Sequence, residues 1–163
     1  MIEQLYSENS RKIMQSKKVL EQSFKIKLSS KDHIITIHGK PEDEYLAFQA
    51  IEALNMGFSV GEALLLKNED FILEKINIKA ITKRKNLAQV RARIIGTKGK
   101  AIRVIEDLSG CYIVVHDNSV GIMGFSEDVK KAAFAIKRLI AGSKHATVFS
   151  YLEEQKALEK QSF

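Results

Sequence analysis

One stretch of the chain occurs twice, and this internal repeat limits the possible folds more than any other feature. Residues 39–57 and 124–142 match at a constant offset of 85 positions. The shared apolar residues are spaced as on one face of an α-helix, and two copies are too few for a solenoid, so the repeat predicts a duplicated small domain. The matching pairs are Gly39/Gly124, Glu42/Glu127, Asp43/Asp128, Ala47/Ala132, Ala50/Ala135, Ile51/Ile136, Leu54/Leu139 and Gly57/Gly142.

Each repeated helix is expected to follow a pair of strands and an earlier helix. Alternating or β-branched residues predict strands over 24–28 and 33–38 in the first copy, and over 111–115 and 119–123 in the second. Helices are predicted before them, over roughly 10–22 and 100–108. The repeated unit is therefore helix–strand–strand–helix, an α+β pattern.

The second copy carries more chain upstream. Residues 71–78 are typical of a strand, and the spacing of Leu87, Val90 and Ile94 predicts a short helix after it. Gly96-Thr97-Lys98-Gly99 joins that helix to the next one. The expected order is β-α-GxxG-α-β-β-α. A chain of 163 residues with 45% hydrophobic residues can build two such small cores.

Positive charge is concentrated in the second half. Residues 1–81 have a formal net charge of −1 and residues 82–163 one of +7. Such a one-signed stretch suits a polyanion, although a solvated surface is the plainer interpretation. Eight basic residues and no acidic one lie between positions 83 and 103: Lys83, Arg84, Lys85, Arg91, Arg93, Lys98, Lys100 and Arg103.

The glycine loop has the chemistry of a phosphate clamp. Two glycines let the backbone approach a phosphate, and the helix that follows presents unpaired N–H groups and the positive end of its dipole. Lys98 and Lys100 add charge, and Ile94, Ile102 and Ile105 are expected to line an apolar slot for unstacked bases. The alternative is a purely structural turn between two helices. A second GxxG, at 121–124, lies in an uncharged strand and is interpreted as structural.

The segment Ile94-Ile95-Gly96-Thr97-Lys98-Gly99-Lys100-Ala101-Ile102 resembles the signature of the KH (K homology) fold. Nearly the whole chain, including residues 56–64 and 145–153, is similar to the two-KH small-subunit rRNA assembly factors called the "partner of Nob" family. The resemblance implies tandem type I KH domains, the first degenerate and truncated, plus a short C-terminal helix. The implied boundaries are a degenerate KH-like domain at 1–57, a connector helix at 58–70, a KH domain at 71–142 and a C-terminal extension at 143–163.

This resemblance also implies a function. Members bind single-stranded rRNA near the 3′ end of the small-subunit RNA, work with the endonuclease that matures that end, and in archaea contact the alpha subunit of initiation factor two. Residues 93–100 and the tail look closer to the archaeal form, which implies a cytoplasmic protein, and the first loop is more like the eukaryotic form, which implies nucleolar, nuclear and cytoplasmic locations. The expected RNA-binding residues are Arg91, Arg93, Ile94, Gly96, Thr97, Lys98, Gly99, Lys100, Ile102 and Arg103.

The first copy departs from the signature. Residues 7–10, Ser-Glu-Asn-Ser, stand where the loop is expected, without glycine and with a carboxylate. Only six residues precede them, too few for the upstream strand and a full helix, so this copy is expected to be a scaffold.

Other function classes find little support in the sequence. No apolar run is long enough to span a membrane, and the first residues carry acids where a signal peptide would be apolar. The single cysteine, Cys111, is expected to be a small core residue, and the histidines have no zinc-ligand spacing. No enzyme and no cofactor are expected. The alternative function is a protein–protein adaptor whose basic face docks an acidic partner, such as an initiation factor subunit.

Overall fold

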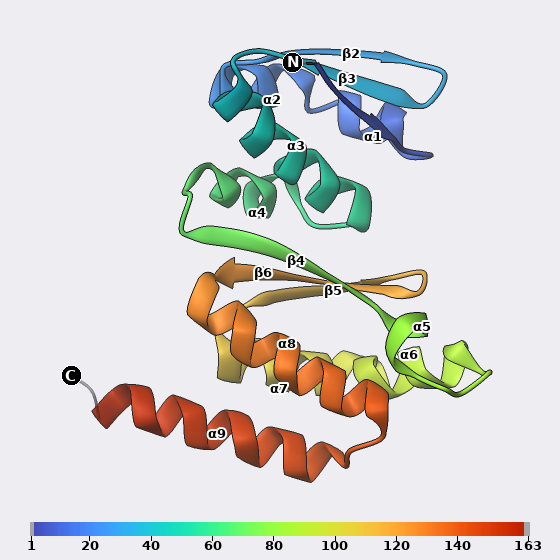
Figure 1. The fold of residues 1–163 in the computed structure, drawn as a ribbon, viewed down its shortest axis with the longest axis vertical. Helices are drawn as coiled ribbons and strands as arrows, with labels where there is room; N and C mark the ends of the chain where they lie inside the picture. The colour runs from blue at the N-terminus through green and yellow to red at the C-terminus, as the bar shows by residue number, and fades with distance from the viewer. Residues whose placement is uncertain (1, 162–163) are drawn as a thin grey trace. The chain divides into compact units, whose positions relative to one another are not determined.

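The computed structural model describes residues 2–161 of the chain, which divides into two compact units, residues 1–71 and 72–163. Each unit is an α+β structure with one three-stranded sheet (Figure 1). The first unit contains β1 (Glu3–Tyr6), α1 (Ser10–Met14), α2 (Lys17–Phe24), β2 (Lys27–Lys31), β3 (Ile34–His38), α3 (Pro41–Met56), α4 (Val60–Leu64) and a 3-10 turn, η1 (Leu65–Lys67).

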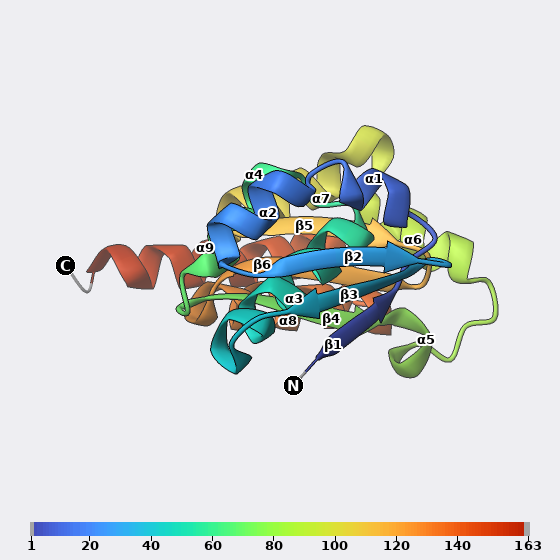
Figure 2. The same cartoon turned by 90° about the horizontal axis from the view of Figure 1, so that it is seen from above.

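The sheet of the first unit has the order β1-β3-β2, with both neighbouring pairs antiparallel. Figure 2 looks onto this sheet. Alternation along β3 directs Ile35 and Ile37 inward, where both are completely buried, and the register places Leu28 of β2 beside Ile37. Helix α3 packs on the strands with the stripe that contains Ala47, Ala50 and Ile51, so the repeated apolar positions are core positions.

The second unit repeats this arrangement with a longer chain. Its sheet has the order β4-β6-β5, and one core joins the inner face of that sheet to the helices. Helix α9 packs against both α7 and α8, on the side of these helices away from the sheet (Figure 1). The elements are β4 (Phe71–Asn77), α5 (Ile78–Ile81), α6 (Leu87–Ile95), the 3-10 turn η2 (Thr97–Gly99), α7 (Lys100–Ser109), β5 (Tyr112–His116), β6 (Ser119–Phe125), α8 (Ser126–Ala141) and α9 (His145–Gln161).

The repeat extends from sequence to individual contacts. In the first unit, Leu28 N donates to Glu21 Oε2 over 2.8 Å, which ties α2 to β2. In the second unit, 85 positions later, Ile113 N donates to Glu106 Oε2 over 3.0 Å, which ties α7 to β5. The hairpin turns also correspond, because Asp32 and Asp117 both have φ of 51°. The two units therefore share element order, strand order and supporting hydrogen bonds.

The repeated helices begin and end at corresponding positions within the repeated segments 39–57 and 124–142. Helix α3 starts at Pro41 and α8 starts at Ser126, each with acidic residues in its first turn. Their C-caps, Gly57 and Gly142, have φ of 107° and 112°, in the left-handed region that favours glycine. The short helix α4 begins with a capping box between Ser59 and Glu62.

Several expectations for the first unit are wrong. An upstream strand is present, because β1 pairs with β3 although only four residues long. The predicted helix over 10–22 is two helices, and Gln15 and Ser16 form their junction. The loop expected at residues 7–10 is therefore misplaced, because residues 7–9 lie between β1 and α1 and Ser10 begins α1. The first expected strand is misplaced as well, since α2 extends to Phe24, Lys25 caps it in the left-handed conformation and β2 begins only at Lys27.

The C-terminal helix is longer than expected. Helix α9 has 17 residues, and Val148 and Leu152 on it are 3% and 1% exposed within the core of the second unit. Their burial explains the length, since the helix gains packing against α7 and α8 that an isolated tail would lack.

Candidate nucleic-acid interface

The loop at 96–99 has a backbone that few sequences other than a glycine loop could adopt. Gly96, Lys98 and Gly99 have φ of 76°, 55° and 76°, so three of the four residues have left-handed φ values. The turn is closed by Gly99 N, which donates to Gly96 O over 3.1 Å. Lys98 accepts this unusual conformation without being glycine, which indicates that the surrounding turn holds it in place.

The two glycines are required for different reasons. A Cβ on Gly96 would lie 2.6 Å from Ala101 Cβ and 2.7 Å from Ala101 N, so this glycine lets the loop pack closely on α7. A Cβ on Gly99 would meet no atom within 4 Å, so only its positive φ favours glycine. Gly96 therefore belongs to the packing of the unit, and Gly99 leaves the backbone open to a ligand.

The loop leads directly into the N-terminus of α7. Within the described residues, no side chain caps the first turn of α7, and that turn contains no acidic residue. Thr97, Lys98 and Lys100 are exposed around it, and Arg103 Nη2 donates to Lys98 O over 3.0 Å. The positive helix end and the exposed lysines beside it are features that favour an anion.

The apolar part of the predicted site is only partly accessible. Ile94 and Ile105 are 0% exposed, so the expectation that they line an open slot is wrong for both. Both lie on the inner faces of their helices, α6 and α7, in the core that the sheet and α8 complete. Ile102 is half-buried, packs against the same core and remains the apolar side chain of the predicted set that a ligand can contact.

Two of the predicted arginines hold the unit together. Arg93 Nη1 donates to Leu139 O over 2.5 Å and its Nη2 donates to Ser143 O, which fastens α6 to the turn after α8. Arg91 Nη1 donates to Asn118 Oδ1 over 2.5 Å, at the turn between β5 and β6. These guanidinium groups already have hydrogen-bond partners inside the unit. Arg91 and Arg93 therefore differ from the exposed lysines of the loop, whose side chains extend into solvent.

One residue of the basic stretch at 83–103, Arg84, lies beside the end of α8. A Cβ on Gly142, which caps α8, would lie 4.0 Å from Arg84 Nη2, so Arg84 reaches the end of α8.

Sequence reasoning missed the residues that support the loop. Glu106 holds α7 against β5 through the backbone of Ile113, and Asn118 holds Arg91. The sequence did contain a sign of Glu106, because Glu21 and Glu106 are 85 positions apart, as the residues of the repeat are. The pair lies outside the repeated segments 39–57 and 124–142 and was therefore overlooked. For Asn118, no local pattern indicates a partner 27 positions away.

The first unit has a groove of its own without a glycine loop. At the 85-residue offset, residues 96–99 correspond to residues 11–14, which lie in α1. A groove of about 660 Å³ lies between α1, the start of α2 and the β2–β3 hairpin, with Arg11, Lys17 and Lys31 among its lining residues and Asp32 as the only carboxylate among them.

Other kinds of site are not supported by residues 2–161. In that range, no three metal-ligating side chains come together, and none of the helices has the length and apolar character of a membrane span. Cys111 is 4% exposed, and burial raises the pKa of its thiol to about 11, so it is an unreactive core residue, as expected from the sequence.

Comparison with known proteins gives consistent matches. Residues 72–157 match a family model for the second KH domain of PNO1, described as a eukaryotic type KH-domain (KH-domain type I). The KH domain-containing protein MJ0443 of Methanocaldococcus jannaschii is 33% identical over 86% of this chain and 65% of its own length. The pre-rRNA-processing protein PNO1 of Coccidioides immitis is 31% identical over 69% of this chain and 46% of its own length.

A solved structure resembles nearly the whole chain. The structure of the a/eIF2alpha-aDim2p-rRNA complex from Pyrococcus horikoshii contains a chain with a TM-score of 0.87 and 31% identity, covering 96% of this chain and 94% of that one. By contrast, this chain spans about two thirds of the archaeal curated relative and less than half of the fungal one.

Proposed function

The chain belongs to the PNO1 family of KH-domain proteins, and on this premise we propose that it is a non-enzymatic RNA-binding factor of small-ribosomal-subunit assembly. The observation that carries the proposal is the loop at 96–99, a turn with three positive φ values and exposed side chains at Thr97 and Lys98, which leads into an N-terminus of α7 that no side chain caps. This geometry suits the phosphate backbone of single-stranded RNA better than a small molecule or a folded duplex.

In the proposed binding mode, a phosphate lies against the backbone N–H groups of the loop and of the first turn of α7. Lys98 and Lys100 neutralise the neighbouring phosphates, and the hydrogen bond from Arg103 to Lys98 O fixes the loop before RNA arrives. Ile102 offers an apolar contact to an unstacked base. The backbone contacts give affinity, and the base contacts beside them give sequence preference.

We further propose that the two units are tandem KH domains and that the first is degenerate. The shared element order, strand order and Glu21/Glu106 hydrogen bonds support a common origin. Because the first unit has an α1–α2 junction without glycine, it cannot clamp a phosphate with its backbone in the same way. Its basic groove, with Arg11, Lys17 and Lys31, can add phosphate contacts through side chains.

The proposed partners follow from the relatives. The solved archaeal relative of this chain is in a complex with a/eIF2alpha and rRNA. A fungal relative of this chain is named a pre-rRNA-processing protein. We therefore propose rRNA near its 3′ end as the ligand, with an initiation factor two alpha subunit and the 3′-end endonuclease as protein partners.

The test replaces Thr97 and Lys98 by Asp in the full chain. Both side chains are exposed, so the fold should persist, while two carboxylates repel the phosphate at the loop. Binding to a single-stranded oligonucleotide with the 3′-end rRNA sequence should weaken about 10- to 100-fold, measured by fluorescence anisotropy. The circular dichroism spectrum and Tm should be those of the parent protein.

A matched control makes the same change of residue types and charge elsewhere in the second unit. Thr147 and Lys130 are also exposed, and the double variant Thr147→Asp/Lys130→Asp should bind the oligonucleotide with nearly the parent affinity. Equal loss in the two double variants would mean that net charge alone controls binding, and no loss in either would remove the loop from the binding site.

A further inference from the structure

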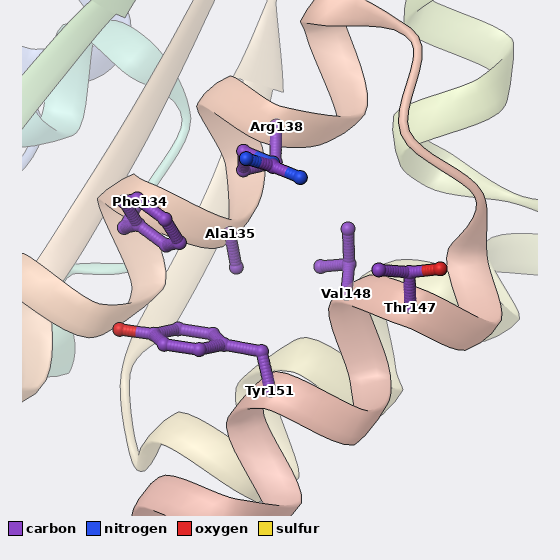
Figure 3. Close-up of a pocket in the computed structure, with 6 residues that line it drawn as sticks. All are labelled: Phe134, Ala135, Arg138, Thr147, Val148 and Tyr151. Carbon is purple, nitrogen blue, oxygen red and sulfur yellow. The ribbon is translucent and has the colours of Figure 1, made fainter.

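A small apolar pocket lies between α8 and α9, outside the candidate RNA site. Figure 3 shows side chains from the two helices converging on it, and its volume is about 190 Å³. Ala135 and Val148 are buried walls, whereas Phe134 remains 47% exposed. The lining residues are Phe134, Ala135 and Arg138 of α8 and Thr147, Val148 and Tyr151 of α9.

The pocket is held in shape by contacts among its own lining residues. The rings of Phe134 and Tyr151 are 4.8 Å apart between centroids and tilted by 50°, and Arg138 Cζ lies 5.9 Å from the centre of the Phe134 ring. Arg138 Nε also donates to Ser143 Oγ over 3.1 Å. An exposed phenylalanine fixed beside an arginine in this way is a feature of binding surfaces more than of ordinary solvated helices.

Size restricts what the pocket can take. Ligand and cofactor sites usually measure about 300–1,000 Å³, whereas an apolar cavity of about 150 Å³ holds a single benzene molecule. The pocket therefore accommodates one aliphatic or aromatic side chain and no cofactor.

The local charge indicates what should flank that side chain. The stretch 145–152 of α9 contains no Asp, Glu, Lys or Arg. The stretch 133–142 contains two charged residues, Arg138, which lines the pocket, and Lys137, whose Nζ lies 3.9 Å from Glu74 Oε1. Arg84 reaches the end of the same helix, beside Gly142. The acidic residues of α9 begin at Glu153, beyond the pocket lining. A partner with carboxylates next to its apolar side chain is complementary to this edge.

We propose that the pocket is the docking site for an acidic segment of a partner protein, which inserts one Leu-sized or Phe-sized side chain and pairs a carboxylate with Arg138. A nucleobase fits less well, because stacking needs an open ring face and the Phe134 ring already contacts Arg138 and Tyr151. This proposal does not depend on RNA binding at the glycine loop.

The experiment titrates the isotope-labelled full chain with three acidic peptides that differ only in one central residue, Phe, Leu or Ser. The Phe and Leu peptides should shift the amide signals of Ala135, Thr147 and Val148, and the Ser peptide should bind at least about tenfold more weakly. Arg138→Glu should weaken binding of the Phe peptide by about tenfold or more. Thr147→Phe, which places a large ring at the exposed rim, should do the same.

Lys130→Glu is the control, because it makes the same charge change on an exposed position of α8 that does not line the pocket. It should leave peptide binding within about twofold of the parent. Three results would overturn the proposal: no shifts with either anchored peptide, equal losses for Arg138→Glu and Lys130→Glu, or shifts of the same amides by a single-stranded oligonucleotide and not by peptide. Self-association of the chain that Arg138→Glu abolishes would also overturn it, since the occupant would then be a second copy.

Discussion

At the scale of single residues, the two glycines of the loop have different structural roles that the sequence alone does not distinguish. Gly96 and Gly99 occupy equal places in the GxxG pattern, yet only Gly96 is packed tightly against α7. The pattern could be recognised from the sequence because it depends on spacing. The burial of Ile94 and the internal hydrogen bonds of Arg93 could not be predicted, since both depend on elements that come later in the chain, and Leu139 O is 46 positions from Arg93.

The two glycines should therefore respond differently to alanine. Gly96→Ala should lower the free energy of unfolding by about 3 kcal/mol or more, through strained φ and overlap with Ala101. Gly99→Ala should cost only about 1–2 kcal/mol, since its Cβ meets open space. Urea denaturation of both variants measures the difference, and equal losses would contradict the assignment of Gly96 to packing.

The lysines of the loop should act through charge alone. Lys98→Ala and Lys100→Ala should each flatten the plot of log affinity for single-stranded RNA against log salt by up to about 0.7. A variant that changes the preferred RNA sequence at constant slope would show that its lysine contacts a base.

Arg93 provides the opposite case. Arg93→Ala removes donors to Leu139 O and Ser143 O, which should lower the free energy of unfolding by about 1.5–3 kcal/mol. The salt dependence of RNA binding should stay that of the parent protein. A reduced slope without loss of stability would instead place Arg93 on the phosphate backbone.

At the scale of elements, helix ends that are marked by a characteristic residue could be predicted from the sequence. Helices α3 and α8 each end at a glycine, and the repeated segments 39–57 and 124–142 exceed them by at most two residues at either end. Strand β1 was missed because four residues with one buried side chain leave too short a pattern, and its partner β3 is about 30 positions away. The break between α1 and α2 was missed because no glycine or proline marks it.

Helix α9 should contribute to the stability of the second unit. Leu152→Ala should lower the free energy of unfolding by about 2–5 kcal/mol, because Leu152 is 1% exposed in the core. Leu158, on the same helix but 56% exposed, is the matched control, and Leu158→Ala should change stability by less than about 1 kcal/mol. Thermal or urea unfolding distinguishes the two, and similar effects would mean that α9 is not part of the core.

At the scale of the whole molecule, the two units share a strand order and differ in the glycine loop and in the helices α5 and α9 of the second unit. Both have the same strand order and the same Glu-to-backbone hydrogen bond, but only the second has a glycine loop. Repetition in the sequence made the duplication predictable. The sequence did not show how far the repeat extends before residue 39. In that part of the chain only scattered residues, such as Glu21 and Asp32, recur 85 positions later.

A fragment of residues 72–163 should fold and keep most of the affinity for single-stranded RNA, because it contains a complete core and the loop. Cooperative urea unfolding and anisotropy binding of the fragment check this expectation. Affinity that falls to the level of the Thr97→Asp/Lys98→Asp variant would assign the main RNA contacts to the first unit.

The position of Leu152 in the core also sets the order in which the protein matures during its own synthesis. Translation delivers residues from the N-terminus, and domains generally fold as units as they emerge. The sheet and α3 of the first unit are available once residue 56 has left the ribosome, whereas the core of the second unit lacks Val148 and Leu152 until α9 emerges. The unit with the glycine loop is therefore the last to be completed, and a nascent chain stalled before residue 148 would present a finished first unit and an open second one.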